Sequence, residues 1–144
     1  MLLAARVLLT VATLGSGGVP IAADFNRTHA ANLRWTGHAR FHAVWQGLSY
    51  AGLGIVALGL IWVPASDQLA HARIAALIAS CVYAGFFGAV FSRSRYDGRL
   101  HDDNGYQPMV VRVRESRLEL DLNTTLFAAM TLILSAGWIL ILAD

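Results

Sequence analysis

The sequence predicts an all-α integral membrane protein, a single domain that forms a four-helix bundle. Only 14% of its 144 residues are charged and 56% are hydrophobic, whereas a soluble domain carries about 25% charged residues. Four apolar segments stand out, at about residues 2–23, 41–63, 74–91 and 122–143. Each is close to the ~20 residues that a helix needs to cross a bilayer. None alternates like a strand, so helices are expected, and no room remains for a large soluble catalytic domain.

The first segment also has features of a secretory signal peptide. Arg6 precedes an apolar stretch, and the small residues Ala22 and Ala23 follow it. We expect a true membrane span instead, because four helices make a better packed bundle than three. Pro20 is typical of the end of such a helix.

The second and third segments are rich in small residues, which in lipid allow helices to approach closely. A turn at Pro64, Ser66 and Asp67 separates them. The two segments are therefore predicted to form a tightly packed hairpin. The small residues are Gly47, Ala51, Gly52, Gly54 and Gly59 in the second segment, and Ala84, Gly85, Gly88 and Ala89 in the third.

The third connection, at residues 92–121, is long and has two parts. Residues 97–105 are polar turn material, whereas residues 111–114 and 118–121 alternate between apolar and charged side chains. Alternation with period two predicts a short β-ribbon. The competing interpretations are an interfacial helix and an early start of the fourth span. If the fourth span begins near residue 122, Asn123, Thr124 and Thr125 are its expected caps.

Arginine placement predicts the orientation. Every one of the 11 basic residues is arginine, and the first and third connections hold nine of them, leaving Arg6 and Arg73 for the other side. Cytoplasmic loops carry the excess of basic residues. We therefore expect a protein of the bacterial inner membrane with these connections in the cytoplasm and both termini outside. The nine are Arg27, Arg34, Arg40, Arg93, Arg95, Arg99, Arg112, Arg114 and Arg117.

Residues 24–46 hold the densest group of chemically versatile side chains. With a helix beginning near Thr36, His38, His42 and Gln46 are spaced four residues apart and share one helix face. Polar groups at this depth usually face the protein interior or a wet cavity. Three of the five histidines fall in this stretch, which makes it the candidate functional site.

His38 and His42 are the predicted acid–base or metal-binding pair, with Asp24 and His29 orienting them. The spacing also suits a divalent metal held by His38, His42 and His29. Ala39 follows His38, so the zinc-protease pattern, which needs Glu at this position, is excluded. The candidate ligand-binding residues are Asn26, Asn32, Trp35, Arg40, Trp45 and Gln46.

A structural role is the alternative for each of these residues. Asp24 is a good helix-capping residue, and Thr28 and Asn32 are suited to satisfy backbone groups in a loop. Tryptophans near span ends form aromatic belts. The third connection returns to the same side and brings Asp97, His101, Asp102 and Asp103, for which a solvated turn is favoured. Whether these four join the site is left open.

The pattern Asp24-x-Asn26-x-Thr28-His29 followed by Asn32, Trp35 and His38-Ala39-Arg40-Phe41-His42 resembles an uncharacterised family of small four-helix membrane proteins. It covers about a seventh of the chain. The resemblance implies the four-helix layout and supports the site, but it implies no reaction.

The leading hypothesis is a membrane protein that binds a lipid or hydrophobic small molecule within its bundle and isomerises, cyclises or hydrates it. Arg40 would hold an anionic headgroup. The alternatives are a non-enzymatic subunit with a structural histidine cluster, which glycine-rich faces would assemble into a homo-oligomer, and an oligomeric channel. The net charge of +2 is too small to indicate nucleic acid.

Overall fold

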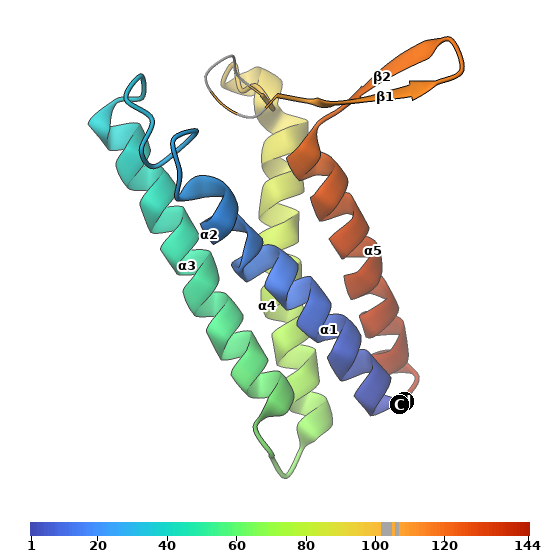
Figure 1. Ribbon diagram of the computed structural model, residues 1–144. Coiled ribbons are helices and arrows are strands. Elements are labelled where there is room, and N and C mark those ends of the chain that lie inside the picture. The colour runs from blue at the N-terminus through green and yellow to red at the C-terminus, as the bar shows by residue number, and fades with distance from the viewer. Residues whose placement is uncertain (102–104, 106) are drawn as a thin grey trace.

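The computed structural model describes residues 1–101, 105 and 107–144. This part of the chain is mainly helical and carries one small antiparallel sheet (Figure 1). Its elements in order are α1 (Leu2–Gly17), α2 (Val19–Asp24), α3 (Gly37–Trp62), α4 (Gln68–Ser92), the 3-10 turn η1 (Arg93–Arg95), β1 (Met109–Val113), β2 (Ser116–Leu120) and α5 (Leu122–Leu142).

Four helical stretches are long and apolar enough to cross a membrane: Leu2–Asp24, Gly37–Trp62, Gln68–Arg95 and Leu122–Leu142. They run up and down, so that both termini and the α3–α4 turn lie at one end of the bundle (Figure 1). The α2–α3 loop and the β-ribbon lie at the opposite end, which we call the loop end. The predicted helical fold is confirmed, and its length and composition are compatible with an integral membrane protein.

Side-chain caps fix where three of the helices begin. The Thr36 hydroxyl accepts a hydrogen bond from the Ala39 N–H, so α3 begins four residues before its apolar segment. Asp67 caps α4 in the same way. Asp121 caps α5, and its carboxylate accepts from the Thr124 N–H over 2.6 Å. The expected cap at residues 123–125 is therefore wrong by two residues, because a carboxylate at the N-cap satisfies the free amides.

Helix α1 lies at the centre of the bundle and packs against α3, α4 and α5. Its residues Ala5, Leu9 and Ala12 are buried in the core with Ile61, a run of alanines on α4, and Leu134 and Ile141 on α5. Short side chains on α4 let the neighbouring helices approach closely. Most of this core lies in the half of the bundle nearest the termini.

Arg6 joins α1 to the end of α3. Its Nε donates to the Ile61 carbonyl over 2.8 Å, and its guanidinium lies 4.5 Å from the centre of the Trp62 ring. The Trp62 indole N–H in turn donates to the Thr10 hydroxyl. A cation suits the free carbonyls at a helix C-terminus. The basic residue that resembled part of a signal peptide is thus built into the packing of the bundle.

A close helix crossing joins α1 and α3, in addition to the predicted packing of α3 against α4. A Cβ added at Gly17 would lie 3.1 Å from the Gly54 Cα, and one at Gly47 would meet the Phe25 ring. On α4, by contrast, a Cβ at Gly85 or Gly88 would have no neighbour within 4 Å. Gly54 and Gly47 of α3 therefore admit α1 and the end of α2, whereas Gly85 and Gly88 of α4 leave open space.

The first membrane-length stretch breaks between α1 and α2. The Gly18 N–H still bonds to the Leu14 carbonyl, but Pro20, at the start of α2, has no N–H to continue the helix. Beyond the break, α2 packs against α3, where Ile21 and Phe25 lie over Gly47. Helix α1 therefore fills the centre of only one half of the bundle.

The predicted β-ribbon is confirmed. β1 and β2 pair antiparallel, with Met109 opposite Leu120 and Val113 opposite Ser116. The chain turns at Arg114, which adopts a φ of 54°. Figure 1 shows the ribbon projecting sideways from the loop end, immediately before α5.

Candidate functional site

A cleft of about 480 Å³ opens at the loop end of the bundle, where α2 has turned aside. Its walls come from α2, the following loop, α3, α4 and α5. Ligand sites are typically about 300–1,000 Å³ and mostly apolar, with a few polar groups. The lining residues are Val19, Pro20, Ala23, Asp24, His29, Trp35, Ala39, His42, Ala43, Gln46, Tyr50, Gly85, Phe86, Ala89, Asn123 and Phe127.

The polar and apolar parts of the cleft come from different elements. Asp24, His29, His42, Gln46 and Tyr50 belong to α2, the α2–α3 loop and α3. The α4 and α5 walls are formed by small and aromatic residues, apart from Asn123. The Phe86 and Phe127 rings lie 4.3 Å apart and are inclined by 32°. The cleft thus offers a polar wall opposite an apolar one, which suits an amphiphilic molecule.

A short hydrogen-bond network shapes the loop after α2. The Asn26 side-chain amide donates to the Ala23 carbonyl over 2.7 Å and so closes the end of α2. Its Oδ1 accepts from both the backbone N–H and the hydroxyl of Thr28. Thr28 Oγ1 lies 2.8 Å from Nδ1 of His29. Three residues of the predicted pattern are therefore linked in one chain of hydrogen bonds.

This network selects a tautomer of His29. The single hydroxyl proton of Thr28 is directed to Asn26, so Thr28 Oγ1 must accept from His29. Nδ1 of His29 then carries the proton, and Asp24 Oδ1, 3.8 Å from Nδ1, favours the same assignment. In the neutral ring, the acceptor lone pair is therefore on Nε2. A side chain in this form has the properties of a general base.

The Trp35 ring holds His29 from the side. The two rings meet edge to face, with their centroids 5.1 Å apart. Both rings line the cleft, and Asn32, which is 5% exposed, fixes the loop between them by donating to the Thr28 carbonyl. Packing and hydrogen bonds therefore determine the position of His29.

His38 and His42 contact each other on the first turns of α3. Their Nε2 atoms lie 3.1 Å apart, so one nitrogen donates and the other accepts. Both side chains are exposed, and His42 lines the cleft whereas His38 does not. One more turn along, the Gln46 side-chain amide donates to the Tyr50 hydroxyl over 3.2 Å. The predicted polar stripe therefore continues one turn further than expected, to Tyr50.

Besides His38, four predicted site residues lie outside the lining of the cleft. Asn26 and Asn32 shape the loop, as their alternative structural role implied. Trp45 is 57% exposed and packs beside the His42 ring. Arg40 Nε is buried and finds no hydrogen-bond partner in the part of the chain that the structure describes.

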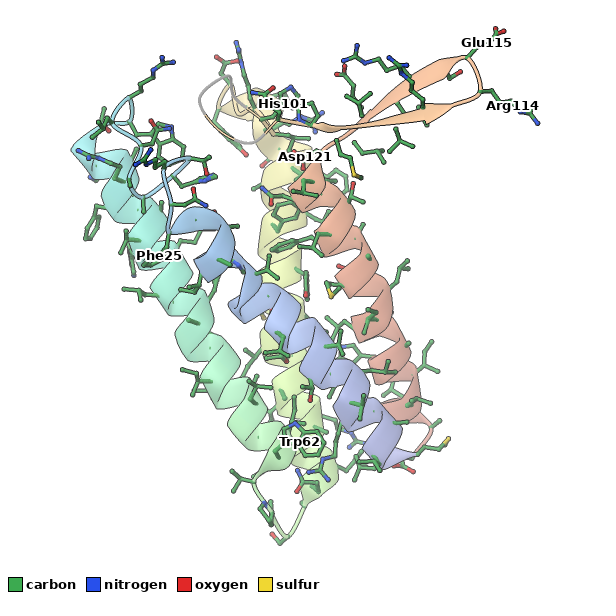
Figure 2. All side chains as sticks on the ribbon, in the orientation of Figure 1. Phe25, Trp62, His101, Arg114, Glu115 and Asp121 are labelled. Carbon is green, nitrogen blue, oxygen red and sulfur yellow. The ribbon has the colours of Figure 1, made fainter. Side chains whose placement is uncertain are left out.

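Among the described residues of the third connection, none of the predicted ones lines the cleft. Asp97 and His101 are exposed and are absent from its walls, and Figure 2 shows His101 at the loop end, toward Asp121. Asp102 and Asp103 lie outside the described residues. Within residues 1–101, 105 and 107–144, no three His, Cys, Asp or Glu side chains gather in a way that could hold a metal ion. The predicted ligands His29, His38 and His42 do not form such a group.

The sequence reasoning missed Tyr50, Phe86, Asn123 and Phe127 as lining residues. Tyr50 was accessible from the spacing, because it continues the four-residue repeat of His38 and His42. The other three belong to helices that are apolar on every side, where no periodic pattern marks the wall of a cavity.

Comparison with known proteins adds a family but no activity. No curated protein and no solved structure matches the chain. A model described as a family of unknown function, DUF6640, matches residues 8–113. This range includes the α2–α3 loop with His29, the His38–His42 pair and the α4 wall of the cleft. The chain therefore belongs to this family of unknown function, DUF6640.

Proposed function

We propose that this protein is an integral membrane protein that binds an amphiphilic lipid or hydrophobic small molecule in the cleft at the loop end. The observation that carries the proposal is the division of the cleft into a polar and an apolar wall. A hydrocarbon portion would pack on Phe86 and Phe127, and a polar group would lie near Asp24, His29 and His42. The four membrane-length helices support a bilayer setting.

Acid–base conversion of the bound molecule is the chemistry we propose, as an isomerisation, cyclisation or hydration. His29 lines the cleft, and its imidazole is the group we propose for removing a proton. His42, which is itself exposed, lines the cleft and lies 3.1 Å from His38. His42 would deliver a proton to the substrate, and His38 would restore it from water.

The arrangement of arginines supports a cytoplasmic location for the loop end. Both connections that hold nine of the arginines emerge there, whereas Arg6 and Arg73 lie toward the other end. In a bacterial inner membrane, this distribution would favour an orientation with both termini outside. The cleft would then open at the cytoplasmic leaflet.

Filling the cleft tests binding. Gly85 lines the cleft and its missing Cβ has no neighbour within 4 Å, so Gly85→Leu adds a side chain to the cleft without a clash at the Cβ. Gly88→Leu is the matched control, because it is equally open but outside the lining. Mass spectrometry of detergent-purified protein should find a co-purified amphiphile in wild type and Gly88→Leu, and at least tenfold less in Gly85→Leu. Equal amounts in the two variants would contradict the proposal.

A histidine comparison separates chemistry from structure. His42→Ala should retain the fold and the amphiphile but stop its conversion to an isomer, a cyclised product or a hydrate, followed by chromatography and mass spectrometry. His101→Ala, which changes an exposed histidine at the same end, should convert at the wild-type rate. If His42→Ala unfolds in detergent and wild type holds no small molecule, the histidines are structural and the non-enzymatic alternative is favoured.

A further inference from the structure

The β-ribbon is amphipathic, and its register defines the two faces. Residues directly opposite each other in an antiparallel pair share a face. Met109 therefore shares one face with Leu120, and Val111 shares it with Leu118. Arg112 and Arg117 form a pair on the other face, next to the Val110–Glu119 pair. We call these the apolar face and the arginine face of the ribbon.

The apolar face is accessible in the isolated chain. Met109 is 44% exposed and Leu118 is 48% exposed, and Figures 1 and 2 show the ribbon extending away from the helices to its tip at Arg114 and Glu115. An isolated two-stranded hairpin is at best marginally stable in water. A surface that covers the apolar face would supply the burial that the ribbon lacks.

The arginine face contains an unfavourable charge contact. Arg112 and Arg117 are directly opposite each other, and like charges in this position destabilise a strand pair. Arg117 also lies 3.2 Å from Glu119, whereas Arg112 has no ion pair with a described residue. An anion between the two guanidinium groups would relieve the repulsion. Phosphate fits this position, because guanidinium binds its oxygens in a forked geometry.

The position of the ribbon in the fold identifies the source of this phosphate. β2 ends at Leu120, and α5 begins two residues later at Leu122, where a membrane-length helix starts. The ribbon leaves this end sideways (Figure 1). With the four long helices spanning a bilayer, as proposed above, the start of α5 lies where the bilayer meets water, and the ribbon extends from there. An amphipathic element at that level buries its apolar face at the boundary between headgroups and acyl chains. Its opposite face then lies among the headgroups.

We propose that the ribbon binds the membrane surface itself, with its apolar face in the acyl boundary and the Arg112–Arg117 pair holding the phosphate of an anionic lipid. The proposal rests on the membrane setting of the proposed function but not on the cleft or its chemistry. It assigns the third connection a separate role, as an in-plane anchor beside α5.

Hydrogen exchange in lipid nanodiscs tests the proposal with the full chain. The comparison uses discs of phosphatidylcholine alone and discs with one third phosphatidylglycerol. We expect amides of residues 109–120 to exchange at least tenfold more slowly in the anionic discs. Equal exchange in both discs, with the four long helices protected, would overturn the role of the ribbon while leaving the membrane setting intact. A chain that inserts into neither disc would overturn both proposals.

Variants test the contributions of the arginine face and the apolar face of the ribbon separately. Arg112→Gln with Arg117→Gln should remove the difference between the discs, whereas Arg93→Gln with Arg95→Gln, two exposed arginines outside the ribbon, should preserve it. Leu118→Ser should speed exchange of the ribbon in both discs. Inorganic phosphate added to neutral discs should not restore the protection, and restoration would indicate a site for free phosphate instead. Protection that appears equally in both discs, and only with two chains per disc, would show that a second copy covers the ribbon and would overturn the proposal.

Discussion

The phenol of Tyr83 on α4 donates a hydrogen bond of 2.6 Å to the main-chain carbonyl of Ala12 on α1. The two residues are 71 positions apart, and both are buried. The same ring meets Phe127 of α5 edge to face. One side chain therefore links three helices directly beneath the cleft.

Tyr83→Phe should lower the free energy of unfolding by about 1 kcal/mol, because it removes this bond and leaves a buried carbonyl lone pair without its partner. Thermal or SDS unfolding in detergent would measure the change. Tyr96→Phe is the matched control, since its hydroxyl also bonds to a helix carbonyl, that of Ala89, but the residue is 58% exposed. Water replaces that bond, so a loss as large as that of Tyr83→Phe would contradict the argument.

Thr13→Val should stabilise the protein. Thr13 is 2% exposed, and its hydroxyl has no hydrogen-bond partner among the described residues. A buried hydroxyl without a partner costs about 1–3 kcal/mol, and valine has nearly the same shape. Thr10→Val should instead lower the melting temperature, because the Thr10 hydroxyl bonds to both the Arg6 carbonyl and the Trp62 indole. A fall in melting temperature for Thr13→Val would show that its hydroxyl is satisfied.

Gly17→Ala should destabilise the bundle by about 1–3 kcal/mol, the usual cost of forcing extra volume into a packed core. The new Cβ would lie 3.0 Å from the Tyr50 carbonyl and 3.1 Å from the Gly54 Cα, so only a shift of backbone could accommodate it. Gly52→Ala places the same group where nothing lies within 4 Å. It should gain about 0.5–1 kcal/mol from helix propensity. Matched unfolding curves in one detergent would compare the two, and similar values would argue against the close α1–α3 crossing.

Thr28→Val should allow the neutral His29 ring to adopt both of its tautomers. Without the hydroxyl, Nδ1 loses the acceptor that keeps its proton in place. Nitrogen-15 chemical shifts of the His29 ring at high pH should change from a pure Nδ1–H form to a mixture of tautomers. Thr28→Ser keeps the hydroxyl and should keep the wild-type shifts. A mixture already present in wild type would refute the assignment.

Much of the fold could be predicted because it depends on local signals. Four apolar segments predicted the helices, the Thr36 hydroxyl marks the start of α3, and alternating side chains predicted the ribbon. The predicted α3–α4 hairpin packs as expected, but its glycines show only that a close approach is possible and not which helix makes it. Gly54 admits Gly17 of α1, which no local pattern indicates.

The candidate site, too, was predicted only in part. Asp24, His29, Trp35, His42 and Gln46 were predicted from one stretch of sequence, and all five line the cleft. The structural role of Asn26 and the tautomer of His29 depend on hydrogen-bond directions that spacing does not determine. The α4 and α5 walls depend on how three distant helices pack, and a helix that is apolar on every side carries no mark of its inner face.

The break between α1 and α2 divides the bundle into two halves with different interiors. Where α1 is central, alanines and leucines fill the interior of the bundle. Beyond Pro20, α2 lies closer to α3, and the space at the centre of the bundle is the cleft. The buried core is therefore concentrated near the termini and the open cleft near the loops. Substitutions in the lining of the cleft should consequently cost less stability than substitutions in the buried half.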